Sequence, residues 1–172
     1  ITATPAYLNP WPSRFDPVVG ETPIVREHHG MWDDPKLKSP DLIVIADTGS
    51  WNQVADARPF IEARMNRPII IDHHGHGDIT RRTMRHINVS YAAACEPVAR
   101  ICSLLLGEKL KTLPPDVAEP LYLGIASDTG WFRYSNTTAQ TFRLAAALID
   151  AGANADRVYQ IAEQSDSPER IL

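Results

Sequence analysis

A short β-branched run at residues 68–71, Pro-Ile-Ile-Ile, constrains the fold more than any other segment of the 172-residue chain. A run of this length without alternating polar residues is typical of a strand buried on both faces in a parallel sheet. It ends in Asp72, His73 and His74, and Gly75 follows at once. Open α/β sheets bind their ligands at the carboxyl ends of the strands. The sequence therefore predicts a polar site at the end of this strand.

Two further aspartates also follow apolar segments. Asp47 comes after residues 41–46 and Asp128 after residues 121–127, so both are expected in places comparable to that of Asp72. Carboxylates and imidazoles suit a divalent ion such as Mn²⁺, and neither group gains much from burial otherwise. We therefore expect the three aspartates and the histidine pair to meet at one sheet edge as a metal site.

Composition and charge limit the functions open to the chain. With 172 residues, 44% apolar and 22% charged, it is expected to form one globular domain with a sizeable core. Its net charge of −4 argues against the broad basic surface that binds duplex nucleic acid. No apolar run approaches the roughly 18 residues of a membrane span. No signal peptide is visible, so we expect a cytoplasmic protein without a membrane partner.

The two cysteines, Cys95 and Cys102, are predicted to be free thiols. They belong to one expected helix, in which their spacing puts the Cα atoms roughly 10 Å apart. A disulfide needs a Cα separation below about 7 Å. Reduced thiols agree with a cytoplasmic location.

Alternating strand and helix signals predict an α/β fold, a parallel sheet flanked by helices. Seven of the 14 prolines fall in residues 1–40, so this segment is expected to be irregular and packed on a domain formed by residues 41–172. Strands are expected at residues 41–47, 68–72 and 86–89, with a brief edge strand at 132–134. Helices are expected at residues 59–65, 90–106, 114–128, 138–151 and 154–163.

The residue types at the predicted site suit phosphoryl chemistry. His73 and Asp128 would each supply one metal ligand, and the two oxygens of Asp47 could bridge two ions. Two divalent ions about 3.5–4 Å apart clamp the attacking and leaving oxygens of an in-line phosphoryl displacement. His74 would face the phosphate as a hydrogen-bond donor, and Asp72 would support a histidine from behind.

Each of these residues also has an ordinary structural explanation. Asp47 could cap a helix, and Asp128 before Thr-Gly could be a turn residue. Either histidine alone would more often be structural than a ligand. Trp131 could stack on a base, although the tryptophans are expected mainly to pack in the core. The metal interpretation depends on the residues occurring together.

Several neighbouring polar residues are less informative. Glu27-His28-His29-Gly30 resembles the Asp72 segment, but it lies in the Pro-rich region and is expected to be a surface loop. His76 and Asp78 could approach the site or belong to a loop flanked by glycines. Arg81, Arg82 and Arg85 could hold a substrate phosphate or form a solvated face.

These residues resemble the DHH phosphoesterase family, which is named for the triplet that stands here at residues 72–74. The likeness covers residues 41–163. Besides the triplet, it is strongest at residues 123–138, Leu-Gly-Ile-Ala-Ser-Asp-Thr-Gly-Trp-Phe-Arg-Tyr-Ser-Asn-Thr-Thr, and at residues 145–153. This second stretch is most similar to the branch that degrades very short oligoribonucleotides and dephosphorylates adenosine 3′,5′-bisphosphate.

The resemblance implies a hydrolase that uses two Mn²⁺ ions, with Mg²⁺ as an alternative, on a short oligonucleotide or nucleotide. It assigns Asp47 as the bridging ligand, His73 and Asp128 as further ligands, and His74 as the residue at the phosphate. Asp72 completes the catalytic set, and Arg82 and Arg133 are expected to bind substrate together with His74. The resemblance leaves a homodimer open.

The chain departs from the family pattern in two places. The first motif of the family, His-x-x-x-Asp-x-Asp, is not found before Asp47. His29 and Asp33 have its first spacing, but Pro35 stands where the last aspartate should be. The smaller C-terminal domain of the family is also not found. We therefore expect a DHH domain that is incomplete at its N-terminus, a piece of a longer enzyme, with impaired activity by itself.

Two other functions remain open at this point. A non-catalytic nucleotide-binding or regulatory module would explain the absent first motif. A pyrophosphatase or polyphosphatase could use the same metal core, although the likeness at residues 132–138 argues against it.

Overall fold

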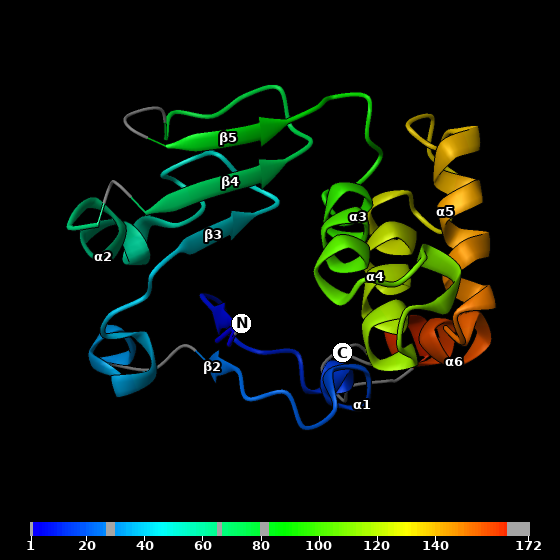
Figure 1. Cartoon of the computed structure of the whole chain (residues 1–172), viewed down its shortest axis with the longest axis horizontal. Helices are drawn as coiled ribbons and strands as arrows, with labels where there is room; N and C mark the ends of the chain where they lie inside the picture. The colour runs from blue at the N-terminus through cyan, green and yellow to red at the C-terminus, as the bar shows by residue number, and fades with distance from the viewer. Residues whose placement is uncertain (1, 27–29, 65–66, 80–82, 165–172) are drawn as a thin grey trace, which may run out of the picture. The chain divides into compact units, whose positions relative to one another are not determined.

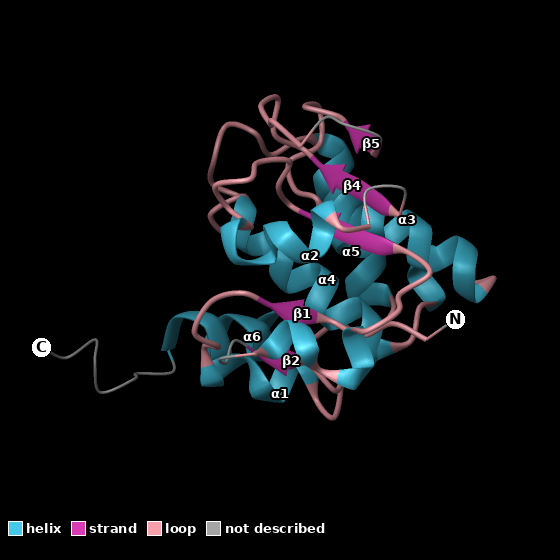
Figure 2. Ribbon diagram, turned by 90° about the vertical axis from the view of Figure 1, so that its left-hand side faces the viewer, coloured by secondary structure: helices cyan, strands magenta, loops and turns pink. Residues whose placement is uncertain are grey.

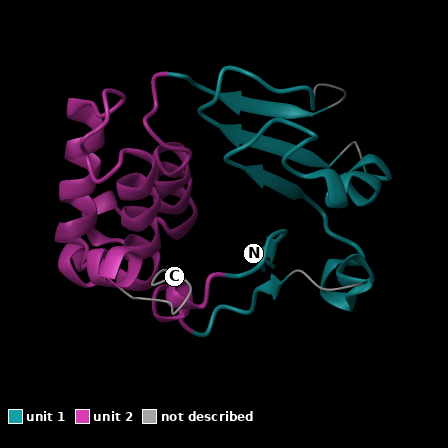
Figure 3. Ribbon diagram, turned by 180° about the vertical axis from the view of Figure 1, so that it is seen from behind, with its two compact units in different colours: residues 1–11, 21–89 teal, residues 12–20, 90–172 magenta. Residues whose placement is uncertain are grey.

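The computed structural model describes residues 2–26, 30–64, 67–79 and 83–164. The chain divides into two compact units (Figure 3), of which unit 1 comprises residues 1–11 and 21–89, and unit 2 comprises residues 12–20 and 90–172. Each unit has its own apolar core. The division into residues 1–40 and 41–172 that the sequence suggested stays a prediction.

A parallel sheet organises unit 1. Its strands are β3 (Ile43–Ala46), β4 (Pro68–Asp72) and β5 (Met84–Ile87), in the order β3-β4-β5 (Figure 1). Ile45 is in register with Ile70, and Ile71 with His86. The central position of β4 explains why its isoleucines run without a polar interruption. The predicted α/β fold with a parallel sheet is confirmed.

One face of this sheet forms the core of unit 1. Ile45 and Ile70 pack with Ile61 of α2 (Arg58–Glu62) and with Ile79, all nearly or fully buried. Val44, which alternates with Ile45, is 53% exposed. Side chains alternate between the two faces of a strand, so this difference identifies which face of β3 packs on α2. Pro59 lies in the first turn of α2, where its missing N–H costs no hydrogen bond.

The Pro-rich segment is more ordered than its composition suggests. The strands β1 (Ala6–Tyr7) and β2 (Val25–Arg26) form a parallel pair. Single 3₁₀ turns follow at Met31–Asp33 and Pro35–Leu37, and α1 (Asp16–Val19) belongs to unit 2. Val25, Met31 and Leu37 form a small buried cluster in unit 1.

Among the residues that the structure describes, unit 2 contains helices and turns but no strand (Figure 2). Its main helices are α3 (Cys95–Leu106), α4 (Pro115–Asp128) and α5 (Ala139–Asp150); α6 (Ala155–Tyr159) continues as a π-helical turn, Gln160–Gln164. Ile125, Leu148 and Val158 are fully buried in its core. None of the described helices is long and apolar enough to cross a membrane.

Two predicted elements differ from the structure. The helix predicted from residue 90 begins at Cys95, because Pro97 fits a first helical turn but would break a helix that had started earlier. The edge strand predicted at residues 132–134 is wrong. Trp131 and Phe132 have φ angles of 58° and 63°, in the left-handed region, which a strand cannot adopt.

Helices α3 and α4 approach most closely at Gly124. A Cβ atom at this position would lie 2.3 Å from Sγ of Cys95, far inside van der Waals contact. Gly124 therefore sets the distance between the two helices.

Both cysteines are free thiols, as predicted, and burial raises the pKa of the Cys102 thiol above its usual value.

We expect Gly124→Ala to lower the free energy of unfolding by about 1–2 kcal/mol, because the cost of overpacking exceeds the roughly 1 kcal/mol gained in helix propensity. Urea denaturation measures the change. In a Cys95→Ala background the sulfur is absent, so the same substitution should be neutral or stabilising. Equal effects in both backgrounds would show that Gly124 and Cys95 are not in contact.

Candidate metal centre

The candidate site of unit 1 lies at the carboxyl ends of β3 and β4. Asp47 directly follows β3, and its backbone N–H donates to the Ile71 carbonyl oxygen (2.9 Å). Asp72 is the last residue of β4, and its carbonyl oxygen accepts from the Asn88 N–H (3.2 Å). Ladder hydrogen bonds therefore hold both aspartates at the same sheet edge, as the sequence predicted.

Asp72 is a fully buried carboxylate that orders the residues after it. Its Oδ1 accepts from the backbone N–H groups of His73 (2.8 Å) and His74 (3.1 Å). The same oxygen lies 2.8 Å from Nδ1 of His74. The other oxygen, Oδ2, is buried and receives no hydrogen bond from any described residue. One side of this carboxylate is saturated, and the other side can still accept a ligand.

His73 and Asp47 complete the cluster. Nε2 of His73 lies 3.3 Å from Oδ1 of Asp47, with 14% of the histidine side chain and 54% of the aspartate side chain exposed. The rings of His73 and His74 are 4.2 Å apart between centroids. One potential ligand atom from each of Asp47, Asp72, His73 and His74 lies within 4.8 Å of the other three. The structure thus brings together four of the predicted site residues.

This donor set fits a divalent cation. Its atoms are carboxylate oxygens and imidazole nitrogens, which are ligands of Mn²⁺ and other first-row metals. A buried carboxylate oxygen without a hydrogen-bond donor costs roughly 1–3 kcal/mol or more. A cation beside Oδ2 would remove this cost. Asp47 has a φ of 67°, a conformation that Asp tolerates better than most residues and that often marks functional sites.

Gly49 and Gly77, which were not among the predicted site residues, pack closely together beside Asp72. A Cβ atom at Gly77 would lie 2.6 Å from the carbonyl oxygen of Gly49. A Cβ atom at Gly49 would lie 3.6 Å from Oδ2 of Asp72. Asp78 fixes this contact because its Oδ1 accepts from the Trp51 N–H (2.7 Å). The sequence shows that both glycines lie shortly after predicted site residues, but it does not show that they touch.

Asp128 belongs to unit 2, whereas the four clustered residues belong to unit 1. It is the last residue of α4, which agrees with the helix predicted at residues 114–128, so its place is comparable to that of Asp72 only in following an apolar run. The run at residues 121–127 is apolar because it belongs to a helix buried in the core of unit 2. The carbonyl oxygen of Asp128 accepts from Nδ2 of Asn136 (3.3 Å). A metal site shared by Asp128 and the unit 1 cluster stays a prediction.

A family model described as "DHH family, N-terminal domain" matches residues 3–125. The chain belongs to the DHH family. The match includes the four clustered residues, whereas Asp128 lies just beyond its end.

Curated relatives agree with this membership. The chain is 33% identical over 126 residues to the "Bifunctional oligoribonuclease and PAP phosphatase NrnA" of Mycoplasma pneumoniae. The aligned region covers 73% of this chain and 37% of that protein. The chain therefore spans little more than a third of the length of this relative.

Two solved structures have a similar fold. An exopolyphosphatase-related protein from Bacteroides fragilis superposes with a TM-score of 0.82 at 22% identity, covering 96% of this chain and 48% of that one. A putative family II inorganic pyrophosphatase from Methanococcus jannaschii gives a TM-score of 0.60 at 20% identity, covering 92% of this chain and 51% of the other. At these identities the likeness establishes the shared fold.

The remaining predicted site residues of this DHH chain have varied positions. The side chain of Arg133 is exposed, and its Nε donates to the Gly130 carbonyl oxygen (2.8 Å). Nε1 of Trp131 donates to Glu163 (3.1 Å), and its ring meets that of Tyr159 edge-on. His76 is exposed, and the side chain of Asp78 binds a backbone N–H as described above. Arg85 and His86 lie in β5; Glu27, His28, His29, Arg81 and Arg82 lie outside the described residues.

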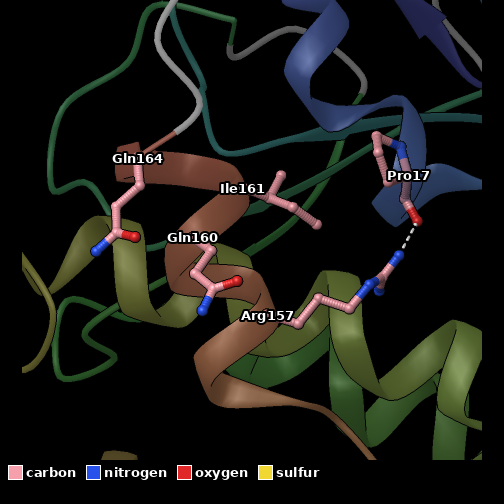
Figure 4. A pocket seen from close by; sticks show the side chains of 5 residues that line it. All are labelled: Pro17, Arg157, Gln160, Ile161 and Gln164. Atoms are coloured by element: carbon pink, nitrogen blue, oxygen red, sulfur yellow. Dashed lines mark hydrogen bonds between the residues drawn. The ribbon is translucent and has the colours of Figure 1, made fainter.

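Unit 2 also has a surface pocket of about 450 Å³, lined by Pro17, Arg157, Gln160, Ile161 and Gln164 (Figure 4). The Arg157 guanidinium is engaged there, because it pairs with Glu119 and donates to the Pro17 carbonyl oxygen (2.7 Å). No predicted site residue lines this pocket.

We expect Gly77→Ala to destabilise the protein by about 1–3 kcal/mol, because the new methyl group must displace the Gly49 backbone. Gly75→Ala is the matched control, since its Cβ would meet only Cγ1 of Val89, at 3.4 Å. Thermal denaturation measures both variants. Equal melting temperatures for the two variants would contradict the close approach of Gly49 and Gly77.

Proposed function

We propose that this chain is the catalytic domain of a phosphoesterase that depends on divalent metal ions. One observation carries the proposal. Two aspartates and two histidines converge at the end of a parallel sheet, and one of them, Asp72, is a buried carboxylate whose Oδ2 receives no hydrogen bond from any described residue, so its negative charge favours a cation held by the neighbouring ligands. A structural cluster would be expected to satisfy that oxygen with a protein donor.

The metal ligands in this proposal are Asp47, His73 and Asp128. Nε2 of His73 and Oδ1 of Asp47 are close enough to bind the same ion. The exposed carboxylate of Asp47 has two oxygens, which can bind two ions. The mixture of nitrogen and oxygen donors favours Mn²⁺ over Mg²⁺, which prefers oxygen ligands and retained waters. A bound divalent ion supplies charge neutralisation at the transferring phosphoryl group.

The protein groups around the ions have separate tasks. Asp72 fixes the ring of His74 through Nδ1, and in this proposal Nε2 is the nitrogen that binds the substrate phosphate. A carboxylate on Nδ1 also stabilises the charged imidazolium, which can donate a hydrogen bond from Nε2. Arg133, and Arg82 outside the described residues, would add positive charge for further phosphates.

The proposed substrates are short oligonucleotides and nucleoside bisphosphates. The printed name of the Mycoplasma pneumoniae relative describes an oligoribonuclease and PAP phosphatase, which agrees with this class. The net charge of −4 does not favour duplex nucleic acid. We place the enzyme in the cytoplasm, where Cys95 and Cys102 would stay reduced. Light scattering on the purified protein would show whether it is a homodimer.

The natural full-length protein should hydrolyse a diadenylate to mononucleotides and release phosphate from adenosine 3′,5′-bisphosphate, in both cases faster than it hydrolyses pyrophosphate. Liquid chromatography of the products measures all three rates. Faster turnover of pyrophosphate than of either nucleotide substrate would show that the proposed substrate class is wrong. Nucleotide binding without turnover of any substrate would indicate a regulatory module.

Asp47→Asn and Asp128→Asn should each lower kcat by more than about 100-fold, since losing even an outer partner of a metal ligand costs 10- to 100-fold. Asp56→Asn is the matched control, because Asp56 is an exposed acid of unit 1 on the 3₁₀ turn Ala55–Ala57. An unchanged rate in Asp128→Asn would show that Asp128 is not a ligand.

Removal of metal should abolish activity. After treatment with EDTA and dialysis, Mn²⁺ should restore the rate fully and Mg²⁺ only in part, because the proposed ligand set includes the imidazole nitrogen of His73. Activity that survives chelation would exclude the metal-dependent mechanism.

A further inference from the structure

The turn that follows Asp128 has an unusual backbone. Gly130, Trp131 and Phe132 are consecutive, and their φ angles of 53°, 58° and 63° all lie in the left-handed region. Residues other than glycine, asparagine and aspartate rarely adopt this conformation, least of all as neighbours. Such a turn persists only where surrounding contacts determine it, and turns of this kind concentrate at functional sites.

Thr129 supplies the central contacts of this turn. Its side chain is fully buried, and Oγ1 donates to the Ile125 carbonyl oxygen (2.7 Å) in the last turn of α4. The same oxygen accepts from the Phe132 N–H (3.1 Å). The carbonyl oxygen of Thr129 accepts from the N–H groups of Arg133 (2.9 Å) and Tyr134 (3.0 Å). Thr129 therefore connects the end of α4 to Phe132, Arg133 and Tyr134 of the turn.

Asn136 also contacts the backbone of Asp128. Nδ2 of Asn136 donates to the carbonyl oxygens of Asp128 (3.3 Å) and Ala92 (3.1 Å), which connects the turn to the segment before α3. On the other side, the Trp131 N–H donates to the Ala126 carbonyl oxygen (2.6 Å). Hydrogen bonds therefore fix the backbone at Asp128 and on its C-terminal side. The Thr129 hydroxyl makes its bonds on the residue that directly follows Asp128.

We propose that Thr129 is a positioning residue for the metal ligand Asp128. Its hydroxyl holds the helix end and the left-handed turn in one geometry, and this geometry fixes the direction of the Asp128 carboxylate. The inference rests on the proposed function, in which Asp128 binds a metal ion. A valine has nearly the same shape but cannot accept from the Phe132 N–H, so the turn would relax and the carboxylate would move.

The test compares three threonine variants of the natural full-length protein. Thr129→Val removes the hydroxyl, whereas Thr129→Ser keeps it. Thr141→Val is the matched control, because Thr141 is also fully buried in unit 2 and donates a hydrogen bond, to Oε1 of Glu96 (3.0 Å). Mn²⁺ affinity is measured by isothermal titration calorimetry, and the melting temperature is measured without metal. Asp128→Asn is included as the reference for loss of the ligand.

Thr129→Val should weaken Mn²⁺ binding about tenfold, the usual effect of losing a group that orients a ligand. Thr129→Ser and Thr141→Val should bind within about twofold of the natural protein, although Thr141→Val should melt at a lower temperature because it also loses a buried hydrogen bond. Natural affinity in Thr129→Val, or equal losses in Thr129→Val and Thr141→Val, would overturn the inference and leave the proposed function standing.

Two further outcomes also decide the question. If Thr129→Val does not fold, a tenfold loss of affinity in the folded Thr129→Ser protein would overturn the inference, because that variant keeps the hydroxyl. If Asp128→Asn binds Mn²⁺ as the natural protein does, Asp128 is not a ligand. The ligand assignment of the proposed function then fails, and the positioning role of Thr129 fails with it.

Discussion

The buried carboxylate of Asp72 is the interaction on which the site of unit 1 depends. It stands at the end of the central strand, where the ladder hydrogen bonds of β4 fix its backbone. Burying a charged group without partners is strongly unfavourable, so the chain immediately after it must supply donors. The N–H groups of His73 and His74 do so, and this requirement turns the chain sharply at the strand end. The two imidazoles are thereby placed beside Asp47 without further secondary structure.

The parts of this arrangement that depend on local pattern could be predicted from the sequence. The bounds of β4 match the prediction, since an uninterrupted β-branched run has few alternatives to a central parallel strand. Asp47 could be placed for a related reason, because parallel neighbours end at the same sheet edge. The helix that ends at Asp128 could also be predicted, from the proline at its start, although its apolar run alone would not distinguish it from a buried strand. Its apolar residues are continuous because α4 is buried on several sides, and a buried helix and a buried strand look alike over a short window.

Other features depend on contacts between distant segments. The contact between Gly49 and Gly77 exists only when the loops after β3 and β4 lie side by side, so no local signal identifies it. The residues after Asp128 were misassigned for a different reason. Aromatic residues such as Trp131 and Phe132 favour strands, but here the contacts of their rings and the Thr129 hydroxyl outweigh that preference. Phe132 stacks on Phe142, with ring planes 26° apart, and this packing offsets part of the backbone strain, about 1–3 kcal/mol per residue.

The tripeptide Asp-Thr-Gly occurs twice, at residues 47–49 and 128–130, and folds differently each time. After β3, the aspartate itself has the positive φ, and Oγ1 of Thr48 accepts from the nearby Ser50 N–H (3.1 Å). After α4, the positive φ begins at the glycine, and Thr129 is buried and connects the helix to the turn. A strand end leaves its last residues extended, whereas a helix end leaves unpaired carbonyl groups that a hydroxyl can use. The same three residues can therefore place a carboxylate at the end of a strand or of a helix. The two sites differ in which residue has the positive φ and in what the threonine hydroxyl bonds.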